Sequence, residues 1–584
     1  MKKLVTGNFA LARGLWEAGG KFIAAYPGTP STEITEFAAE YDEIRAEWSP
    51  NEKVAFEAAL GAAMGGVRSL VAMKMVGLNV AADPLFTAAY TGAKGGLVVV
   101  SADDPGVHSS QNEQDNRHYA KAAKIPMLEP SDSQEVLEFT KYAFELSEQF
   151  DIPVLLRLTT RICHGQSLVE LGDRQQVADK RYEVDFDKYV MIADKARRRH
   201  ALLEQKVVDL GKVSEDCGLN RVEMNDSEIG VICAGACYQY VKEALPEASI
   251  LKIGMSYPLP KQMITNFASQ VRKLYIIEEL DPFIEDIVKS WGIKCTGKEL
   301  FSFGGEIFRE DIEEKILEYP PAKPVLDVSI PPRPPLLCPG CSHRGVFYVF
   351  NKLKLDVSGD IGCYTLGHQS PFRALHCAIC MGASIGISHG LSRAIGDDFS
   401  KRAVAVIGES TFIHSGITSL INIVYNQSNT KVVILDNSIT AMTGHQPNPS
   451  SGFNAKGEIA PTLDLVEVCK ACGISKVIVA DSFDLKGFET TMREVLDFAG
   501  PAVVIVKRPC ALLDRGVKKS LPHVDEKSCI GCGACFKVGC PGLGRKQTDT
   551  GKVKAFIYKT LCNSCGLCAQ VCPQGAIKNK KEEQ

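Results

Sequence analysis

Short apolar runs alternate with longer stretches of helical pattern along most of the chain. Several of these runs are apolar at every position, as strands buried on both faces of a parallel sheet are. Because such strands alternate with helical segments, the pattern predicts an α/β protein with several doubly wound parallel-sheet domains. The predicted strands are residues 21–25, 97–100, 153–156, 230–233, 274–277, 404–407, 432–435 and 503–506.

Three changes along the chain predict domain boundaries. Residues 191–227 are rich in charge and poor in strand-forming residues, which favours a helical connector. Residues 319–335 are rich in proline and favour an extended linker. Beyond residue 512 the chain becomes rich in cysteine and glycine. We therefore expect three α/β domains, at residues 1–190, 228–318 and 336–512, and a small C-terminal domain at 513–584.

Composition adds limits on the class of protein. The 584 residues are 45% hydrophobic and 23% charged, with a formal net charge of −4. These values are typical of a soluble globular protein and give no reason to expect a nucleic-acid or membrane partner. The sequence contains no run of about 18 consecutive apolar residues, so it predicts no transmembrane helix. Near the N-terminus, the polar residues Asn8, Arg13 and Glu17 interrupt the apolar stretch that a signal peptide would need. Of the 21 cysteines, at least eight follow metal-ligand spacing, which favours a reducing, cytoplasmic location.

Those eight cysteines form two motifs in the C-terminal domain, each ending in Cys-Pro. In such a pair, three closely spaced thiolates hold one [4Fe–4S] cluster while the fourth crosses to the other cluster. The alternative is that these cysteines bind zinc. The domain resembles a bacterial two-cluster ferredoxin but has an extra residue before Cys540, which predicts a distorted or labile cluster there. The expected ligands are Cys529, Cys532, Cys535 and Cys572 for one cluster, and Cys562, Cys565, Cys568 and Cys540 for the other.

A second candidate site lies in residues 403–446. One apolar strand ends at Gly408-Glu409-Ser410, and 26 residues later the next strand ends before Asn437. Gly408 would let the backbone approach a phosphate, which the following helix N-terminus favours. Glu409 and Asn437 offer the oxygen ligands that Mg²⁺ prefers. An ordinary buried β-α-β unit is the alternative.

With this spacing the segment resembles the thiamine diphosphate motif, in which Gly-Asp-Gly is followed by Asn. The resemblance implies that Mg²⁺ is bound by Glu409, Asn437 and the backbone carbonyl of Ile439. Glu409 replaces the usual Asp, and Ser410 replaces the usual Gly.

Thiamine diphosphate also needs a carboxyl group to protonate its aminopyrimidine ring. Residues 51–66, NEKVAFEAALGAAMGG, resemble the glutamate and small-residue helix of pyrimidine-binding domains, which makes Glu52 the expected catalytic acid. The alternative is a solvated first-turn glutamate that complements the helix dipole.

The turn AAYPGTPST at residues 24–32 resembles one found in 2-oxoacid:ferredoxin oxidoreductases, where the threonine contacts the substrate carboxylate. That resemblance makes Thr29 a substrate-binding candidate, against a plain Pro-Gly turn. His108, in a polar loop after a predicted strand, is a candidate acid–base residue, against a hydrogen-bonded loop histidine.

A third cysteine pair, Cys338-x2-Cys341, resembles the start of a coenzyme-proximal cluster found in some relatives. The resemblance implies a further ligand in Gly362-Cys363 and a distant one, for which Cys510 is the candidate. The alternative, which we expect, is that these thiols shape the diphosphate pocket and that the chain holds two clusters.

The whole domain order resembles the large subunit of indolepyruvate:ferredoxin oxidoreductases, which belong to the thiamine diphosphate-dependent 2-oxoacid:ferredoxin oxidoreductase family. Pyruvate relatives usually carry Asn where this chain has Met442, which favours a bulkier, less polar substrate such as an aryl pyruvate. The resemblance implies oxidative decarboxylation to an acyl-CoA and CO₂, with coenzyme A, a ferredoxin and a smaller β subunit as partners. The alternatives are another 2-oxoacid, a non-oxidative thiamine decarboxylase, or an electron-transfer subunit with a degenerate thiamine site.

Overall fold

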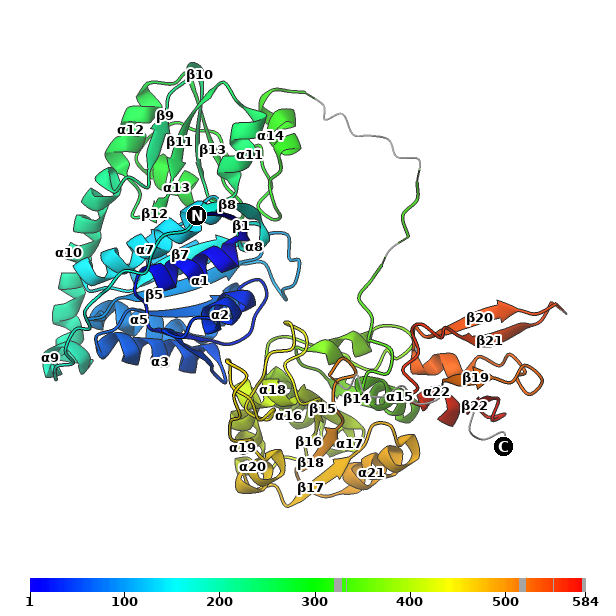
Figure 1. Cartoon of the computed structure of the whole chain (residues 1–584). Coiled ribbons are helices and arrows are strands. Elements are labelled where there is room, and N and C mark those ends of the chain that lie inside the picture. The colour runs from blue at the N-terminus through cyan, green and yellow to red at the C-terminus, as the bar shows by residue number, and fades with distance from the viewer. Residues whose placement is uncertain (320–327, 332, 514–520, 550, 580–584) are drawn as a thin grey trace. The chain divides into compact units, whose positions relative to one another are not determined.

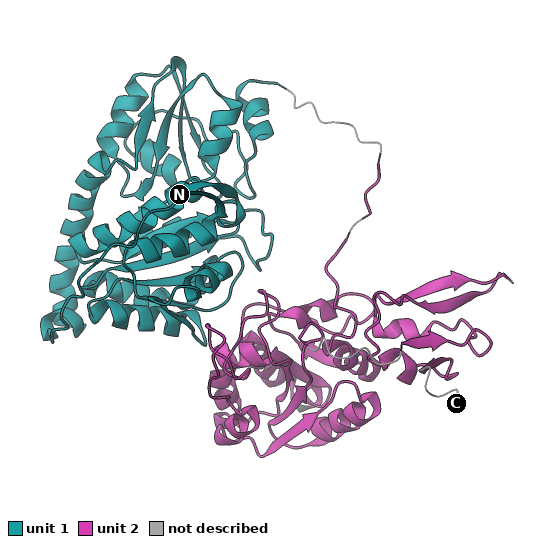
Figure 2. Ribbon diagram, viewed as in Figure 1, with its two compact units in different colours: residues 1–327 teal, residues 328–584 magenta. Residues whose placement is uncertain are grey.

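The computed structural model describes residues 1–319, 328–331, 333–513, 521–549 and 551–579. The chain forms two compact units, residues 1–327 and 328–584 (Figure 2). Of the expected proline-rich linker, residues 320–327 and 332 lie outside the described residues.

Unit 1 contains a seven-stranded sheet that is parallel except at one edge (Figure 1). Side chains at alternate positions of its strands enter two different cores, as a doubly wound sheet requires. Helices α1 (Gly7–Glu17), α2 (Thr32–Ala39) and α7 (Ser133–Phe150) cover one face, and α3 (Glu52–Met64) and α5 (Ala82–Thr91) cover the other. The strand order is β12 (Met255–Tyr257), β6 (Met127–Leu128), β7 (Val154–Thr159), β5 (Leu97–Asp103), β4 (Ser69–Lys74), β2 (Phe22–Ala25) and β3 (Arg45–Trp48).

A second, four-stranded sheet follows in unit 1. Its order is β13 (Lys273–Ile277), β10 (Asp226–Ala234), β11 (Ala248–Ile253) and β9 (Arg221–Glu223), with β9 antiparallel. The predicted connector contains the long helix α10 (Ala193–Asp216), but its C-terminal end forms the unpredicted edge strand β9. Strand β12, from the segment predicted as a separate domain at 228–318, pairs with β6 of the first sheet. The segment predicted as a separate domain therefore contributes an edge strand to the first sheet.

Unit 2 is built on a five-stranded parallel sheet. Helices α15 (His343–Leu353) and α21 (Leu485–Asp497) pack on one face, and α16 (Ala383–Ile395), α19 (Ile417–Tyr425) and α20 (Leu465–Ala471) pack on the other. The strand order is β14 (Asp356–Ser358), β15 (Ala403–Gly408), β16 (Lys431–Asp436), β18 (Ala502–Lys507) and β17 (Lys476–Ala480).

The Cys-rich tail forms two small antiparallel pairs. Strands β20 (Leu543–Gln547) and β21 (Val553–Ile557) make a hairpin, and β19 (Pro522–Val524) pairs with β22 (Ile577–Asn579). Apolar side chains of the tail, such as Val538 and Leu567, join the same core as α15 and α21. The tail is thus packed onto the sheet domain within one unit.

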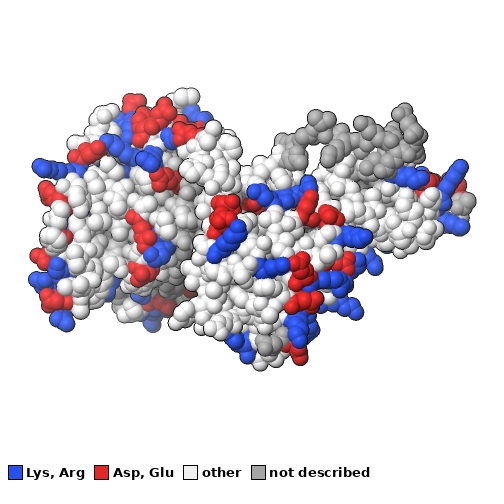
Figure 3. Space-filling view, turned by 90° about the horizontal axis from the view of Figure 1, so that it is seen from below, with Lys and Arg blue, Asp and Glu red and all other residues white. Residues whose placement is uncertain are grey.

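The predicted strands agree with this architecture: each of the eight falls, to within one residue at its start, in β2, β5, β7, β10, β13, β15, β16 or β18. Among the described residues, no helix combines the length and apolarity that crossing a membrane requires. On the face drawn in Figure 3, Lys and Arg side chains are interspersed with Asp and Glu, so that face carries mixed charge.

Candidate functional site

The carboxyl edge of the first sheet collects the predicted residues of unit 1. Strands β5, β4, β2 and β3 are neighbours and run parallel, so the segments that follow them emerge at one edge. Thr29 follows β2, Glu52 follows β3 and the 104–115 loop follows β5. Ser109 Oγ donates to the carbonyl of Thr29 over 3.4 Å, which joins two of these segments directly.

Glu52 is the first residue of α3, after the N-cap Asn51, whose side chain accepts from Val54 N over 2.9 Å. Its side chain is only 4% exposed, so it is not a solvated first-turn glutamate. It lies against Gly77 of α4 (Met75–Val80), where a Cβ atom would come within 2.7 Å of both Cγ and Oε1 of Glu52. The glycine therefore leaves the space that the Glu52 carboxyl occupies.

Lys74, the last residue of β4, also lies at this carboxyl edge of the sheet. It was not among the site residues predicted from the sequence. Its stem lies against Gly28, where a Cβ atom would be 3.1 Å from Lys74 Cγ. Its ammonium donates to the Ser109 carbonyl over 2.9 Å, its only side-chain hydrogen bond within the described part of the chain. Burial lowers the pKa of Lys74, while the nearby charges of Asp104 and Glu52 act in the opposite direction. The sequence signal that could have identified Lys74 is its position as the single charged residue at the end of an otherwise uncharged strand.

His108 lies in an ionic cluster. Its Nε2 is 3.0 Å from Oε2 of Glu306, and Arg161 also donates to Glu306, over 2.5 and 2.8 Å. Glu306 follows the second sheet in the chain, so the cluster holds the 104–115 loop against that region of unit 1. Any acid–base role of His108 would have to operate while its ring is bound to Glu306.

In unit 2, Glu409 and Asn437 come together at the ends of the adjacent strands β15 and β16. The backbone N–H of Ile439 donates to Glu409 Oε1 over 3.1 Å and to Asn437 Oδ1 over 3.2 Å. Asn448, which the sequence did not single out, donates to Glu409 Oε1 over 3.3 Å. Ser410 Oγ accepts from the Thr440 hydroxyl over 3.0 Å.

The environment of Glu409 fits a cation. The side chain is 2% exposed, and burial, followed by the charge of Asp436, raises its pKa to about 8. A buried carboxyl that faces another carboxylate is stabilised when a divalent ion binds beside it. These donors suit the Mg²⁺ of a diphosphate site.

Glycines border the same site. Cβ atoms on Gly362 and Gly408 would lie 2.5 and 2.8 Å from Cε1 of Tyr364, so both positions need a residue without a side chain. Asp360, also missed in the sequence, accepts from the backbone N–H of Gly382 over 2.8 Å and of Ser384 over 3.0 Å. This fully buried carboxylate fixes the start of α16 next to the Gly362 segment.

Four cysteines outside the tail also gather here. Burial, followed by the nearby thiols of Cys510 and Cys338 and the charge of Glu409, raises the pKa of Cys363 to about 11. Burial likewise raises the pKa of Cys341 to about 12, with Cys363 and Cys338 as further causes. Cys338, Cys341, Cys363 and Cys510 are therefore neighbours, although the sequence separates them widely.

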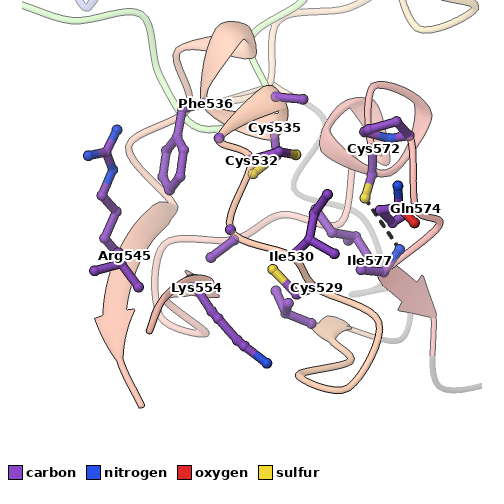
Figure 4. A pocket seen from close by; sticks show the side chains of 18 residues that line it. Cys529, Ile530, Cys532, Cys535, Phe536, Arg545, Lys554, Cys572, Gln574 and Ile577 are labelled. Carbon is purple, nitrogen blue, oxygen red and sulfur yellow. Dashed lines mark hydrogen bonds between the residues drawn. The ribbon is translucent and has the colours of Figure 1, made fainter. Parts of the chain in front are cut away.

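The tail brings its cysteines together in the predicted crossed arrangement. A cavity of about 220 Å³ is lined by Cys529, Cys532, Cys535 and Cys572, and Figure 4 shows their sulfur atoms around one space. A second cavity is lined by Cys540, Cys562, Cys565 and Cys568. Burial, followed by the thiols of its own set and then of Cys535, raises the pKa of Cys568 to about 12, so the two sets are adjacent.

Arg344 of α15 lines the second cavity and ties the tail to the sheet domain. The guanidinium donates to the carbonyls of Val538, over 3.2 Å, and of Gly539. Asn563 donates to the carbonyl of Pro339, next to Cys338, over 3.2 Å. The second cavity therefore lies on the side of the tail that faces the sheet domain.

Three family descriptions match the chain. "Pyruvate flavodoxin/ferredoxin oxidoreductase, thiamine diP-bdg" matches residues 13–207. "Thiamine pyrophosphate enzyme, C-terminal TPP binding domain" matches residues 360–506, which include Glu409 and Asn437. "4Fe-4S binding domain" matches residues 555–578, which include the second cysteine motif.

Similar proteins include some that cover almost the whole chain and one that covers about half of it. The "Indolepyruvate oxidoreductase subunit IorA" of Archaeoglobus fulgidus is 39% identical over 99% of this chain and 98% of its own length. The protein of the same name from Thermococcus kodakarensis is 40% identical over 99% and 97%. The "2-oxoglutarate synthase subunit KorA" of Methanothermobacter marburgensis is 25% identical over 53% of this chain and 96% of its own length.

Proposed function

The chain belongs to the IorA family of indolepyruvate oxidoreductase subunits, and we propose that it oxidises indolepyruvate and other aryl pyruvates. It is a thiamine diphosphate-dependent 2-oxoacid:ferredoxin oxidoreductase with a 4Fe–4S domain. The full-length likeness to IorA subunits carries the proposal. Met442, 51% exposed in the loop after Ile439, is in keeping with an apolar substrate.

The proposed reaction converts a 2-oxoacid and coenzyme A into an acyl-CoA and CO₂, with one proton and two electrons released. The electrons leave one at a time through the clusters to a ferredoxin. When bound, thiamine diphosphate supplies the electron sink for cleavage of the carbon–carbon bond.

Each residue of the chain has a distinct task in this proposal. Glu409 and Asn437, with the Ile439 carbonyl, would hold the Mg²⁺ that accompanies the diphosphate. The buried Glu52 carboxyl holds the proton that the aminopyrimidine needs. Thr29 and Lys74 bind the substrate carboxylate, because the Lys74 ammonium has donors left beyond its bond to Ser109. His108 assists proton transfer near this edge.

The eight tail cysteines hold two [4Fe–4S] clusters in the crossed arrangement. The grouping of Cys338, Cys341, Cys363 and Cys510 favours a second candidate arrangement, in which a third cluster lies beside the diphosphate site. Iron analysis of the anaerobic protein separates the two: about eight iron atoms per chain supports two clusters, and about twelve supports three.

A smaller second subunit completes the enzyme in this proposal, as the word "subunit" in the relatives' names implies for those proteins. The decisive experiment is an anaerobic assay of the purified complex with coenzyme A and an artificial electron acceptor. Comparing indolepyruvate, phenylpyruvate, pyruvate and 2-oxoglutarate should give the highest kcat/KM for an aryl pyruvate.

Three outcomes would replace the proposal. A preference for pyruvate would change the substrate. An aldehyde as the sole product, without dye reduction, would indicate a non-oxidative decarboxylase. Protein without thiamine diphosphate, whose activity survives Glu52→Gln, would indicate an electron-transfer subunit.

A further inference from the structure

The two cysteine sets of the tail have different surroundings, and this gives the electron path a direction. The set Cys540, Cys562, Cys565 and Cys568 shares its cavity with Arg344, which is 1% exposed and belongs to the sheet domain. We call this the inner set. The outer set, Cys529, Cys532, Cys535 and Cys572, has no lining residue from the described part of the sheet domain, and its Cys532 is exposed. An external acceptor can therefore approach the outer set most closely.

The surface around the outer set is basic, although the whole chain is acidic. Residues 521–579 carry eight Lys and Arg against three Asp and Glu, whereas the full chain has a net charge of −4. Arg545 and Lys554, from opposite strands of the β20–β21 hairpin, line the cavity itself (Figure 4). The positive field is thus local to the tail.

Part of this charge is compensated inside the tail and part is not. Lys546 and Lys554 are directly opposite each other in the hairpin. Lys546 forms an ion pair of 3.1 Å with the Glu526 carboxylate, whereas Lys554 donates to the backbone carbonyl of Glu526. Arg545 and Lys552 are exposed and have no salt-bridge partner among the described residues. Arg545 instead stacks over Phe536, 5.1 Å from the ring centroid.

Two exposed apolar side chains line the same cavity as Arg545 and Lys554. Ile530 is 67% exposed and Val553 is 51% exposed, and both line the outer cavity. An apolar centre bordered by charge is typical of protein interfaces, and weak electron-transfer complexes bury little area and depend on charge for encounter. We define the basic hairpin surface as Ile530, Arg545, Lys552, Val553 and Lys554.

We infer that the basic hairpin surface is the docking site of the electron acceptor, and that this acceptor is a ferredoxin with an acidic face. The inference rests on the proposed function for the source of the electrons. The inner set receives electrons from the sheet domain, and the outer set delivers them through this surface. Charge complementarity selects the partner, because a positive patch attracts a small acidic protein.

The test uses the complete anaerobic complex and a two-cluster ferredoxin of acidic pI. In the variant Arg545→Glu with Lys552→Glu, the kcat/KM for ferredoxin should fall about tenfold or more at an ionic strength of about 0.01 M. The loss should shrink at about 0.15 M, where the Debye length falls from about 30 to about 8 Å. Reduction of a small uncharged dye should change less than about twofold, and oxidised ferredoxin should bind more weakly by calorimetry without substrate.

The matched control is Lys470→Glu with Arg493→Glu, which changes the net charge equally at exposed positions of α20 and α21. It should leave ferredoxin kinetics unchanged. If the hairpin variant behaves as the wild type, or the control loses as much, the docking site is elsewhere. Should the hairpin variant lose iron, Arg545→Gln with Lys552→Gln replaces it, and the same loss in binding is required.

The same experiment distinguishes failure of the proposed function from failure of the docking inference. If the proposed function fails, no 2-oxoacid would reduce the dye, while ferredoxin binding to the tail could still be measured.

Discussion

Gly77→Ala tests the position of Glu52 without altering any charged group. The new Cβ atom would lie 2.7 Å from both Cγ and Oε1 of Glu52, whereas ordinary contact begins at 3.4 Å. The Glu52 carboxyl must therefore move by about 0.7 Å. A displacement approaching 1 Å costs about 100-fold in rate, or about 2.7 kcal/mol of transition-state stabilisation. We expect kcat to fall to about one hundredth.

The free energy of unfolding should change little. Gly77 lies inside α4 with an ordinary backbone conformation, so alanine gains about 0.5–1 kcal/mol of helix propensity, which offsets the strain on Glu52. The assay is dye reduction under saturating 2-oxoacid, with thermal unfolding measured on the same samples. Gly211→Ala in α10, where a Cβ atom meets nothing within 4 Å, is the control and should keep full activity.

Two results would refute this reasoning. If Gly77→Ala keeps more than half of the wild-type kcat while Glu52→Gln is inactive, the carboxyl tolerates displacement and the geometric argument fails. If both variants stay active, Glu52 is not the catalytic acid.

Three further predictions follow from the other sites. Cys572→Ser should remove the EPR signal of the outer cluster and Cys540→Ser that of the inner one; the reverse pattern would show that the fourth ligands do not cross. Lys74→Met should raise the KM for the 2-oxoacid about tenfold or more with little change in coenzyme affinity, and an unchanged KM would exclude Lys74 from substrate binding. Thiamine diphosphate and Mg²⁺ should bind the wild type more tightly as pH rises toward 8, because burial raises the pKa of Glu409 to about 8 and its proton must leave before the metal binds. Calorimetry on Glu409→Gln should show weaker binding without this pH dependence, and a retained dependence would assign it to another group.

The strands and the cysteine sets could be predicted from the sequence because their signals are local. Fully apolar runs such as 404–407 and 503–506 mark buried parallel strands, and cysteine spacing reports cluster ligands directly. Strands β9 and β12 have no such local signal, because each is only three residues long. Each becomes a strand through its hydrogen bonds to a neighbouring strand, β11 for β9 and β6 for β12. Pairing of that kind depends on tertiary contacts.

The same distinction separates the site residues. Glu409 and Asn437 follow strand ends that the hydrophobic pattern marks, so their approach could be expected. Lys74 and Asn448 reach their sites through tertiary packing, against Gly28 and Glu409 respectively. The four cysteines around Cys363 needed the fold in the same way, because Cys510 lies after the last strand of the sheet.

The extra residue before Cys540 acquires a physical reason from the contacts of the tail. The sequence predicts a distorted or labile cluster at this point. In the structure, the lengthened segment presents the carbonyls of Val538 and Gly539 to Arg344, and Gly539 adopts φ 60°, which glycine tolerates. A Cβ atom on Gly539 would also meet Phe372 at 3.0 Å, so the segment packs directly on the sheet domain. The inserted residue thus serves as an attachment point, and it lies beside the inner set, where the proposed electron path enters the tail.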